Sequence, residues 1–172
     1  MEASRYSAIE SLRDGSPVEI RALRPADRDE LLGALGRMSD ESFRRRFFAP
    51  KRHFSATEIE RYVNVDFATH VALVAVLRED GRPVIVGGGR YIVTEPGVAE
   101  VAFAVDDAHQ GCGIGSLLVR HLTAIARAAG LRELVAEVLS DNAAMLGVFR
   151  KSGLEMTASR DRDVVHVALR FA

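Results

Sequence analysis

Three glycines at alternate positions constrain this chain more than any other feature. They lie in the segment Gln110-Gly111-Cys112-Gly113-Ile114-Gly115-Ser116, directly before residues whose apolar members recur with helical spacing. Glycine adopts backbone conformations that other residues avoid, and it leaves room for a ligand against the backbone. Successive backbone N–H groups then converge on an anion at the positive end of the helix. The segment predicts a pyrophosphate-binding loop, and a glycine-rich turn without a ligand is the alternative.

The spacing of the glycines argues against two common nucleotide-binding folds. A dinucleotide fold has Gly-x-Gly-x-x-Gly right after a strand, whereas here Ser116 takes the place of the third glycine and the polar stretch 106–110 intervenes. A nucleoside-triphosphate loop requires Gly-Lys-Ser/Thr, and this loop contains no lysine. A nucleotide-binding oxidoreductase is therefore the weaker interpretation.

The periodicity on either side of the loop predicts an α/β domain. Segments 71–77, 84–93 and 99–105 read as an antiparallel meander, and Gly87–Gly89 within it suggest a bulge or a close backbone approach. A crossover helix from Ile114 and a parallel strand at 132–139 follow. Further strands are expected at 18–23 and 164–169, and further helices from Pro25, Ser39, Ser55 and Asn142. We expect an N-terminal tail at 1–17 and one domain at 18–172.

Composition narrows the class of protein and its partners. The 172 residues are 48% hydrophobic and 27% charged, as in one globular domain. The net charge is −1, and Arg44–Arg46, the one short basic run, reads as a solvated helix face, so no nucleic-acid partner is expected. The single cysteine, Cys112, indicates a reducing compartment. Residues 1–17 do not resemble a signal peptide and no apolar run approaches membrane-spanning length, so we expect a cytoplasmic protein without a membrane partner.

The segments Ala99–Val105 and Gln110–Gly115, followed by Asn142, resemble the core motif of the GNAT acetyltransferase superfamily, Gln/Arg-x-x-Gly-x-Gly/Ala after a bent strand. The resemblance extends over roughly residues 18–170. Local motifs resemble the acetyltransferase domain of bacterial protein-lysine acetyltransferases; they are Ser39–Phe48, Val65–Phe67 and Val138–Asn142 with Met145.

The resemblance implies an α/β (α+β) protein with the GNAT acyl-CoA N-acyltransferase fold, in which a central mixed sheet contains a β-strand/Gly-rich loop/helix/β-strand cofactor core. It implies acetyl-CoA as co-substrate and no metal. The loop is expected to hold the pyrophosphate of coenzyme A, and the strand before it is expected to pair with the pantetheine arm. Asn142 is expected to hydrogen-bond the cofactor, and from the sequence alone a role as a helix N-cap is an equal alternative that can coexist with it. The residues so implied are Phe103, Ala104, Val105, Gln110, Gly111, Cys112, Gly113, Ile114, Gly115, Ser116 and Asn142.

Acetylation of an amine requires a group that accepts a proton, because a free lysine has a pKa of about 10.4. Glu100 is the only charged residue of its strand, where it shares a face with Ala102 and Ala104. Apolar surroundings of this kind raise the pKa of a carboxyl group, whereas a solvent-facing glutamate is the alternative from the residues alone. The resemblance implies a glutamate base here, so Glu100 is expected as the general base and Glu137 is the second choice.

Two departures from the family pattern stand out. Many members have a tyrosine seven residues after the asparagine as a general acid, and this chain has Phe149, so the acid is unassigned. Cys112 stands where a basic residue is common, and we expect it to be a passive small side chain.

The resemblance implies acetylation of protein lysines, with acyl-CoA synthetases as targets. A small-molecule amine acetyltransferase, in which 39–64 closes a pocket, and a non-catalytic acetyl-CoA-binding regulatory domain remain as alternatives. The identity of the acceptor amine, the acyl-chain preference and the oligomeric state stay open.

Overall fold

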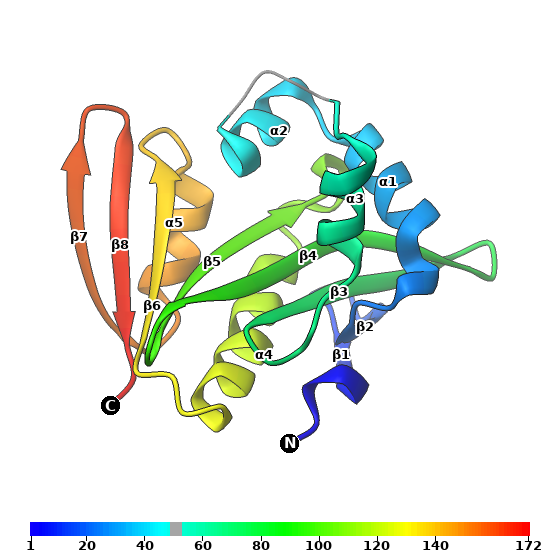
Figure 1. Ribbon diagram of the computed structural model, residues 1–172. Coiled ribbons are helices and arrows are strands. Elements are labelled where there is room, and N and C mark those ends of the chain that lie inside the picture. The colour runs from blue at the N-terminus through cyan, green and yellow to red at the C-terminus, as the bar shows by residue number, and fades with distance from the viewer. Residues whose placement is uncertain (49–52) are drawn as a thin grey trace.

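The computed structural model describes residues 1–48 and 53–172, and within them it contains one mixed sheet of eight strands in the order β1-β2-β3-β4-β5-β6-β8-β7 (Figure 1). The strands are β1 (Ser7–Ser11), β2 (Pro17–Ala22), β3 (His70–Glu79), β4 (Arg82–Glu95), β5 (Val98–Val105), β6 (Glu133–Leu139), β7 (Glu155–Asp161) and β8 (Val164–Arg170). The helices are α1 (Arg28–Arg37), α2 (Asp40–Phe47), α3 (Ala56–Val63), α4 (Ile114–Ala128) and α5 (Ala143–Arg150), with short 3-10 helices η1 (Ala3–Arg5), η2 (Pro25–Asp27) and η3 (Asp107–His109).

The helix starts expected from the sequence are confirmed by their caps. The Ser39 hydroxyl accepts the backbone N–H of Ser42 at 3.1 Å at the start of α2. Ser55 and Glu58 form a reciprocal capping box at the start of α3, with bonds of 3.1 and 2.6 Å. Each cap satisfies N–H groups that have no partner inside the helix, so the starts follow from local sequence.

The central strands form the expected meander and crossover. β3, β4 and β5 are antiparallel neighbours, and the register slips between Ala75 and Val76, opposite the glycine-containing stretch of β4, as a bulge does. Helix α4 then connects β5 to the parallel strand β6. Only Val98, Ala99 and Glu100 of β5 pair with β6, and beyond them the two strands diverge (Figure 1). This divergence divides the sheet into a β1–β5 part and a β6–β8–β7 part.

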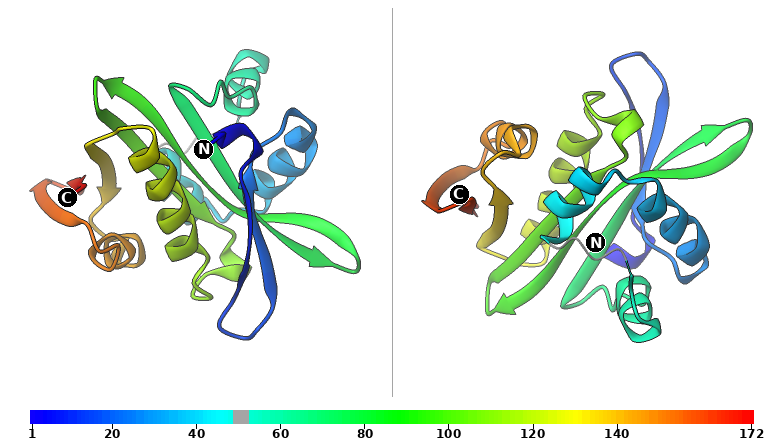
Figure 2. Two further views of the ribbon diagram at one scale, coloured as in Figure 1. Left: turned by 90° about the horizontal axis from the view of Figure 1, so that it is seen from below. Right: turned by 90° about the horizontal axis from the view of Figure 1, so that it is seen from above.

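Two apolar cores lie on opposite faces of the sheet. Helices α4 and α5 cover one face, and α1 and α3 cover the other (Figure 2). The first core contains fully buried residues of α4, including Leu118 and Leu122, and the second joins Leu31 of α1 and Val63 of α3 to β3. Consecutive residues of β3 and β5 therefore point alternately into different layers, which places β5 at the centre of the molecule.

The structure differs from the sequence expectation at both ends. The segment 1–17, expected as a tail, contains β1, which pairs with β2 along its whole length. Its Tyr6 hydroxyl lies 2.5 Å from Nδ1 of His121 on α4, and Glu10 lies 2.7 Å from Nε2 of the same ring. Near the other end, the sequence analysis missed β7, an edge strand whose only partly buried residue is Met156. In the described residues, no helix is long and apolar enough to cross a membrane.

Candidate active site

A cleft of about 440 Å³ opens where β5 and β6 diverge. It is bounded by β5, by the glycine loop before α4, by α5 and by α2. Ten of the eleven residues expected to bind the cofactor line it: Phe103, Ala104, Val105, Gln110, Gly111, Gly113, Ile114, Gly115, Ser116 and Asn142. The structure thus brings together two segments that are separate in the sequence, the strand–loop–helix unit and the start of α5.

The glycine loop has the conformation that its composition predicts. Gly111 and Gly113 have φ of +79° and +96°, values that side chains disfavour. Gly113 is also the N-cap of α4, and it offers no side chain to the N–H groups of the first turn. In α2, α3 and α5 a side-chain oxygen fills that role. The N–H groups at the start of α4 therefore face the cleft with the positive helix end behind them.

The loop is fastened to β5 and to α2 by Gln110. Its Nε2 donates to the Val105 carbonyl at 3.1 Å and lies 3.3 Å from the Ser42 hydroxyl. Asp107 reinforces the link, because its carboxylate accepts the Ser39 hydroxyl at 2.7 Å and the Ser42 hydroxyl at 3.1 Å. Burial raises the pKa of Asp107, but these hydrogen bonds outweigh it and lower the pKa. Gln110 thus uses its side chain to position the loop.

Asn142 and Cys112 differ in how they relate to the cleft. Asn142 lines it and also caps α5, because its Oδ1 accepts the Met145 N–H at 3.2 Å. The N-cap role expected for it is therefore confirmed. Cys112 does not line the cleft. Its side chain is partly buried against the core, with Sγ 3.9 Å from the Gln110 carbonyl oxygen.

The edge of β5 beyond Glu100 has no strand partner on the side of β6. Phe103 stands on this edge, and its ring packs against Phe149 with ring centres 6.0 Å apart. A Cβ added to Gly89 would lie 2.5 Å from the Phe103 ring, so glycine is needed for this close approach. Phe149 is 1% exposed and fills the position of the missing tyrosine with a packed apolar ring. The free edge of β5 has the geometry that accepts an added extended strand.

Three arginines that were not predicted as site residues also line the cleft: Arg13, Arg45 and Arg46. The run Arg44–Arg46 was expected as a solvated helix face, and this is wrong for Arg45 and Arg46. Arg45 is held by Glu41 at 2.8 Å, while its buried Nε has no hydrogen-bond partner among residues 1–48 and 53–172. Consecutive helical residues point about 100° apart, so a run of three basic residues cannot share one solvent face.

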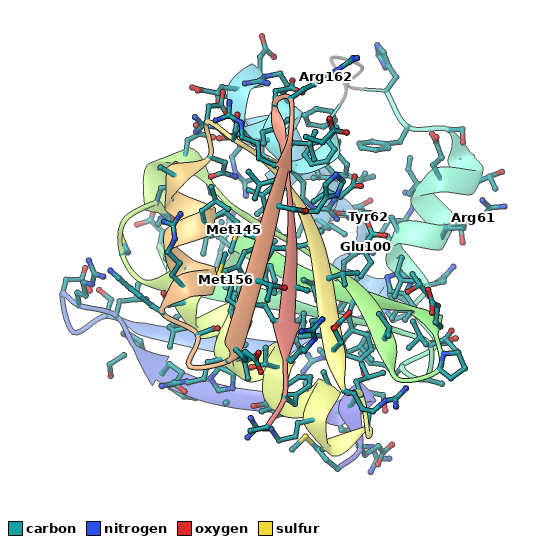
Figure 3. The ribbon with its side chains drawn as sticks, turned by 90° about the vertical axis from the view of Figure 1, so that its left-hand side faces the viewer. Arg61, Tyr62, Glu100, Met145, Met156 and Arg162 are labelled. Atoms are coloured by element: carbon teal, nitrogen blue, oxygen red, sulfur yellow. The ribbon has the colours of Figure 1, made fainter. Side chains whose placement is uncertain are left out.

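Glu100 lies at the point where β5 and β6 separate, as the last β5 residue paired with β6. Its side chain is exposed, so the apolar surroundings expected for it are not present. It lines a shallow cavity of about 410 Å³ together with Glu137, whose carboxylate lies 3.5 Å from His166. In Figure 3, Glu100 and Tyr62 lie toward α3, whereas Met145 lies toward α5. The carboxylate therefore faces the opposite side of the sheet from α5.

A smaller cavity has lining residues in common with the cleft and with the cavity beside Glu100. It shares Phe103, Asn142 and Met145 with the cleft. It also shares Ala136 and Glu137 with the cavity that Glu100 lines. Cavities that share lining residues thus follow the divergence of β5 and β6 from the glycine loop toward Glu100.

The fold and the cleft define a class of acyl-group transferases, and comparisons with known proteins agree. The sequence model of the acetyltransferase (GNAT) family matches residues 37–154, so the chain belongs to this family. It is 34% identical over 138 residues to acetyltransferase PA5475 of Pseudomonas aeruginosa, covering 80% of this chain and 74% of that protein. It is 32% identical over 144 residues to acetyltransferase Pat of Mycolicibacterium smegmatis, covering 83% of this chain but only 42% of that protein.

Among solved structures, the GNAT domain of S. lividans PAT superposes with a TM-score of 0.85 at 35% identity, covering 96% of this chain and 97% of that one. The expected mixed-sheet GNAT fold is therefore confirmed. As a member of this family, the protein is an acetyl-CoA-dependent N-acetyltransferase.

Proposed function

We propose that this enzyme acetylates lysine side chains of other proteins and that Glu100 is its general base. The observation that carries the proposal is the position of Glu100, which is exposed at the point where β5 and β6 separate, beside a series of cavities that share lining residues with the cofactor cleft. A carboxylate at this place meets an amine that arrives from solution, opposite a thioester that arrives through the cleft.

The cleft supports one orientation of acetyl-CoA. We assign the pyrophosphate to the uncapped start of α4 and the loop 110–116, where N–H groups and the helix end favour an anion. The pantetheine arm then runs along the free edge of β5 from Val105 toward Phe103, and Asn142 faces it from α5. This direction brings the thioester to the divergence of β5 and β6, beside Glu100.

The surface around Glu100 favours a lysine of a macromolecule. Ile92 is directly opposite Glu100 in the sheet and is 47% exposed, and His70 is opposite Ile92 on β3. An exposed apolar side chain beside a carboxylate suits the aliphatic stem and the charged end of a lysine. Sites for small molecules bury most of their ligand, whereas Glu100 is exposed.

The reaction requires few groups. Glu100 accepts a proton from the lysine ammonium, and the neutral amine attacks the thioester carbonyl. The C–N bond forms as the C–S bond breaks, and the second amine proton passes to the departing thiolate. Phe149 offers no acid for this last step, and a thiolate of coenzyme A leaves without strong assistance.

Acyl-CoA synthetases are the proposed targets, a class that follows from the resemblance to bacterial protein-lysine acetyltransferases. The 32% identity to a protein named acetyltransferase Pat supports the same branch. A small-molecule acetyltransferase and a regulatory acetyl-CoA-binding domain are the competing functions.

Calorimetry with acetyl-CoA, followed by thiol release with acyl-CoA synthetases and with small amines, tests the proposal. We expect binding, thiol release only with a protein acceptor, and a mass increase of one acetyl group on an acceptor lysine. Release with small amines alone would identify the small-molecule enzyme. Binding without release from any acceptor would favour the regulatory domain and contradict the proposal.

A further inference from the structure

Arg90 has a buried positive charge, and among residues 1–48 and 53–172 its side chain forms no ion pair with a carboxylate. Its side chain rises from β4 opposite Ala102 and is 9% exposed. Its Nη1 donates to the Tyr62 carbonyl oxygen at 3.0 Å and lies 3.2 Å from Nε2 of His70, and its guanidinium carbon lies 3.5 Å from the centre of the Tyr62 ring. None of these partners is an anion.

The buried Arg21 shows how this protein otherwise compensates such a charge. Arg21 is 7% exposed, and its two guanidinium nitrogens donate to the carboxylate of Asp27 at 2.7 and 2.8 Å. The hydrogen bonds that Arg21 donates to Asp27 raise the pKa of Arg21, whereas burial lowers the pKa of Arg90. Buried guanidinium groups are normally paired with a carboxylate. Within the described part of the chain Arg90 has no such pair, and the carboxylate of a ligand can supply it.

Arg46 and Tyr62 form a cluster with Arg90, and this cluster has an excess of positive charge. Burial raises the pKa of the Tyr62 hydroxyl, but the positive charges of Arg46 and Arg90 outweigh it and lower the pKa below its usual value. Among residues 1–48 and 53–172, neither arginine forms an ion pair with an acidic side chain. The three side chains thus present two positive charges and one hydroxyl donor, which together suit a carboxylate.

A cavity of about 50 Å³ lies between these three residues and β5, where it is lined by Ala102 and Ala104. About 10–15 Å³ of such space holds one water molecule, so the cavity has room for a carboxylate group. Asp106 also lines it, and its carboxylate lies 3.7 Å from Nε of Arg37. It shares Met38, Arg46, Ala104 and Val105 with the cofactor cleft. It shares no lining residue with the cavity beside Glu100. The cavity therefore adjoins the cofactor cleft, and through Arg46 and Ala102 it also borders the smaller cavity at the divergence of β5 and β6.

We propose that Arg46, Tyr62 and Arg90 bind the terminal carboxylate of a short dicarboxylic acyl group, so that the enzyme transfers acyl groups of the malonyl and succinyl class as well as acetyl. The inference rests on the orientation of acetyl-CoA proposed above. The reaction is the same: the amide C–N bond forms, the thioester C–S bond breaks, one amine proton goes to Glu100 and the other to the thiolate. The distal carboxylate stays ionised throughout and contacts only the cluster.

Calorimetric binding of succinyl-CoA and butyryl-CoA tests the cluster, because these two ligands have acyl chains of equal carbon number and differ at the far end. We expect the wild type to prefer succinyl-CoA. Arg46→Gln and Tyr62→Phe should each reduce this preference, Arg46→Gln by about 10- to 100-fold, as expected for the loss of a charge-assisted hydrogen bond. Arg90 is left unchanged because it is buried. The control is Arg44→Gln, on the same helix, whose exposed side chain pairs with Asp141 at 2.8 Å and lies outside the cleft.

Two results would overturn the proposal. One is a wild-type preference for butyryl-CoA. The other is a succinyl-to-butyryl ratio that Arg46→Gln leaves unchanged. If Arg46→Gln instead abolished a preference for acceptor peptides with glutamate beside the lysine, the cluster would serve the acceptor and the acyl assignment would be wrong. Binding needs neither an acceptor nor Glu100, so failure of the lysine or base assignment is detected separately, in the thiol-release assay.

Discussion

Replacing Glu100 by glutamine removes the proposed base while it keeps the size of the side chain. At pH 7.5 roughly one lysine amine in 10³ is unprotonated, given its pKa of about 10.4. A positioned general base contributes ~10²- to 10⁴-fold. Glu100 is exposed and stands where the pairing of β5 with β6 ends, so water reaches the amine and replaces part of the function. We therefore expect kcat/KM of Glu100→Gln to fall by about 10²- to 10³-fold, in the lower part of that range.

The pH dependence separates loss of a base from general damage to the site. Without Glu100 the neutral amine must come from solution, so kcat/KM of the variant should rise about tenfold per pH unit up to the pKa of the amine. Thiol release with a protein acceptor, measured from pH 7.5 to pH 9.5, should then show the deficit shrinking by up to about 100-fold. Glu137→Gln, which alters the other carboxylate of the same cavity, should retain nearly full activity.

The reasoning is refuted by a deficit that stays constant with pH, or by an equal loss in Glu137→Gln. Either result would mean that Glu100 positions the acceptor or the strand and does not take the proton.

The remaining predictions concern stability and the loop. Asp27→Ala should lower the free energy of unfolding by about 3–5 kcal/mol and Tm by roughly 10 °C in calorimetry, because it leaves Arg21 buried without its carboxylate; the double variant Arg21→Met/Asp27→Leu should recover most of the loss. In the folded state Arg21 lowers the pKa of Asp27 more than burial raises it. The difference in stability between wild type and Asp27→Asn should therefore be full above the unfolded aspartate pKa of about 3.9 and should vanish as the pH falls through the folded pKa. Urea titrations at several pH values measure this difference, and a difference that grew in acid would contradict the assignment. Gly113→Ala should cost about 1–3 kcal/mol, since φ at this position is +96°, and should weaken acetyl-CoA binding in calorimetry, whereas Gly36→Ala, where a Cβ meets open space in α1, should do neither.

The central part of the fold was predictable because its signals are local. The apolar runs of β3 to β5, the capping serines and the glycine loop each report their own conformation, and all were found where expected. The edge strands β1 and β7 were not found. Their side chains alternate between exposed and half-buried, or are almost all exposed, so they lack the apolar pattern that identifies a strand. Such strands are specified by pairing with a neighbour, which one segment of sequence does not reveal.

The cofactor side of the site was also more predictable than the acceptor side. Ten of the eleven expected binding residues line the cleft, and all of these except Asn142 lie at fixed spacing along one strand, loop and helix. Arg46, Tyr62 and Arg90 come from α2, α3 and β4, and nothing in their local sequence connects them. Their common feature is a charge imbalance, which appears only when the chain is folded. A signal was available at Arg90 alone, a charged residue between three glycines and an apolar run in a predicted strand.

The short ladder between β5 and β6 has a consequence for how the molecule opens. Three residue pairs connect the two parts of the sheet, so the unit from β6 to β8 can separate from the rest by breaking few backbone hydrogen bonds. The amide hydrogens of this short β5–β6 ladder should then exchange with solvent faster than those of β3 and β4. A ligand that lies between β5 and β6 contacts both units and binds only the closed form. Slowing of exchange in the β5–β6 ladder therefore measures the same free energy as ligand affinity. The split that admits the substrate also makes the substrate part of what holds the protein together.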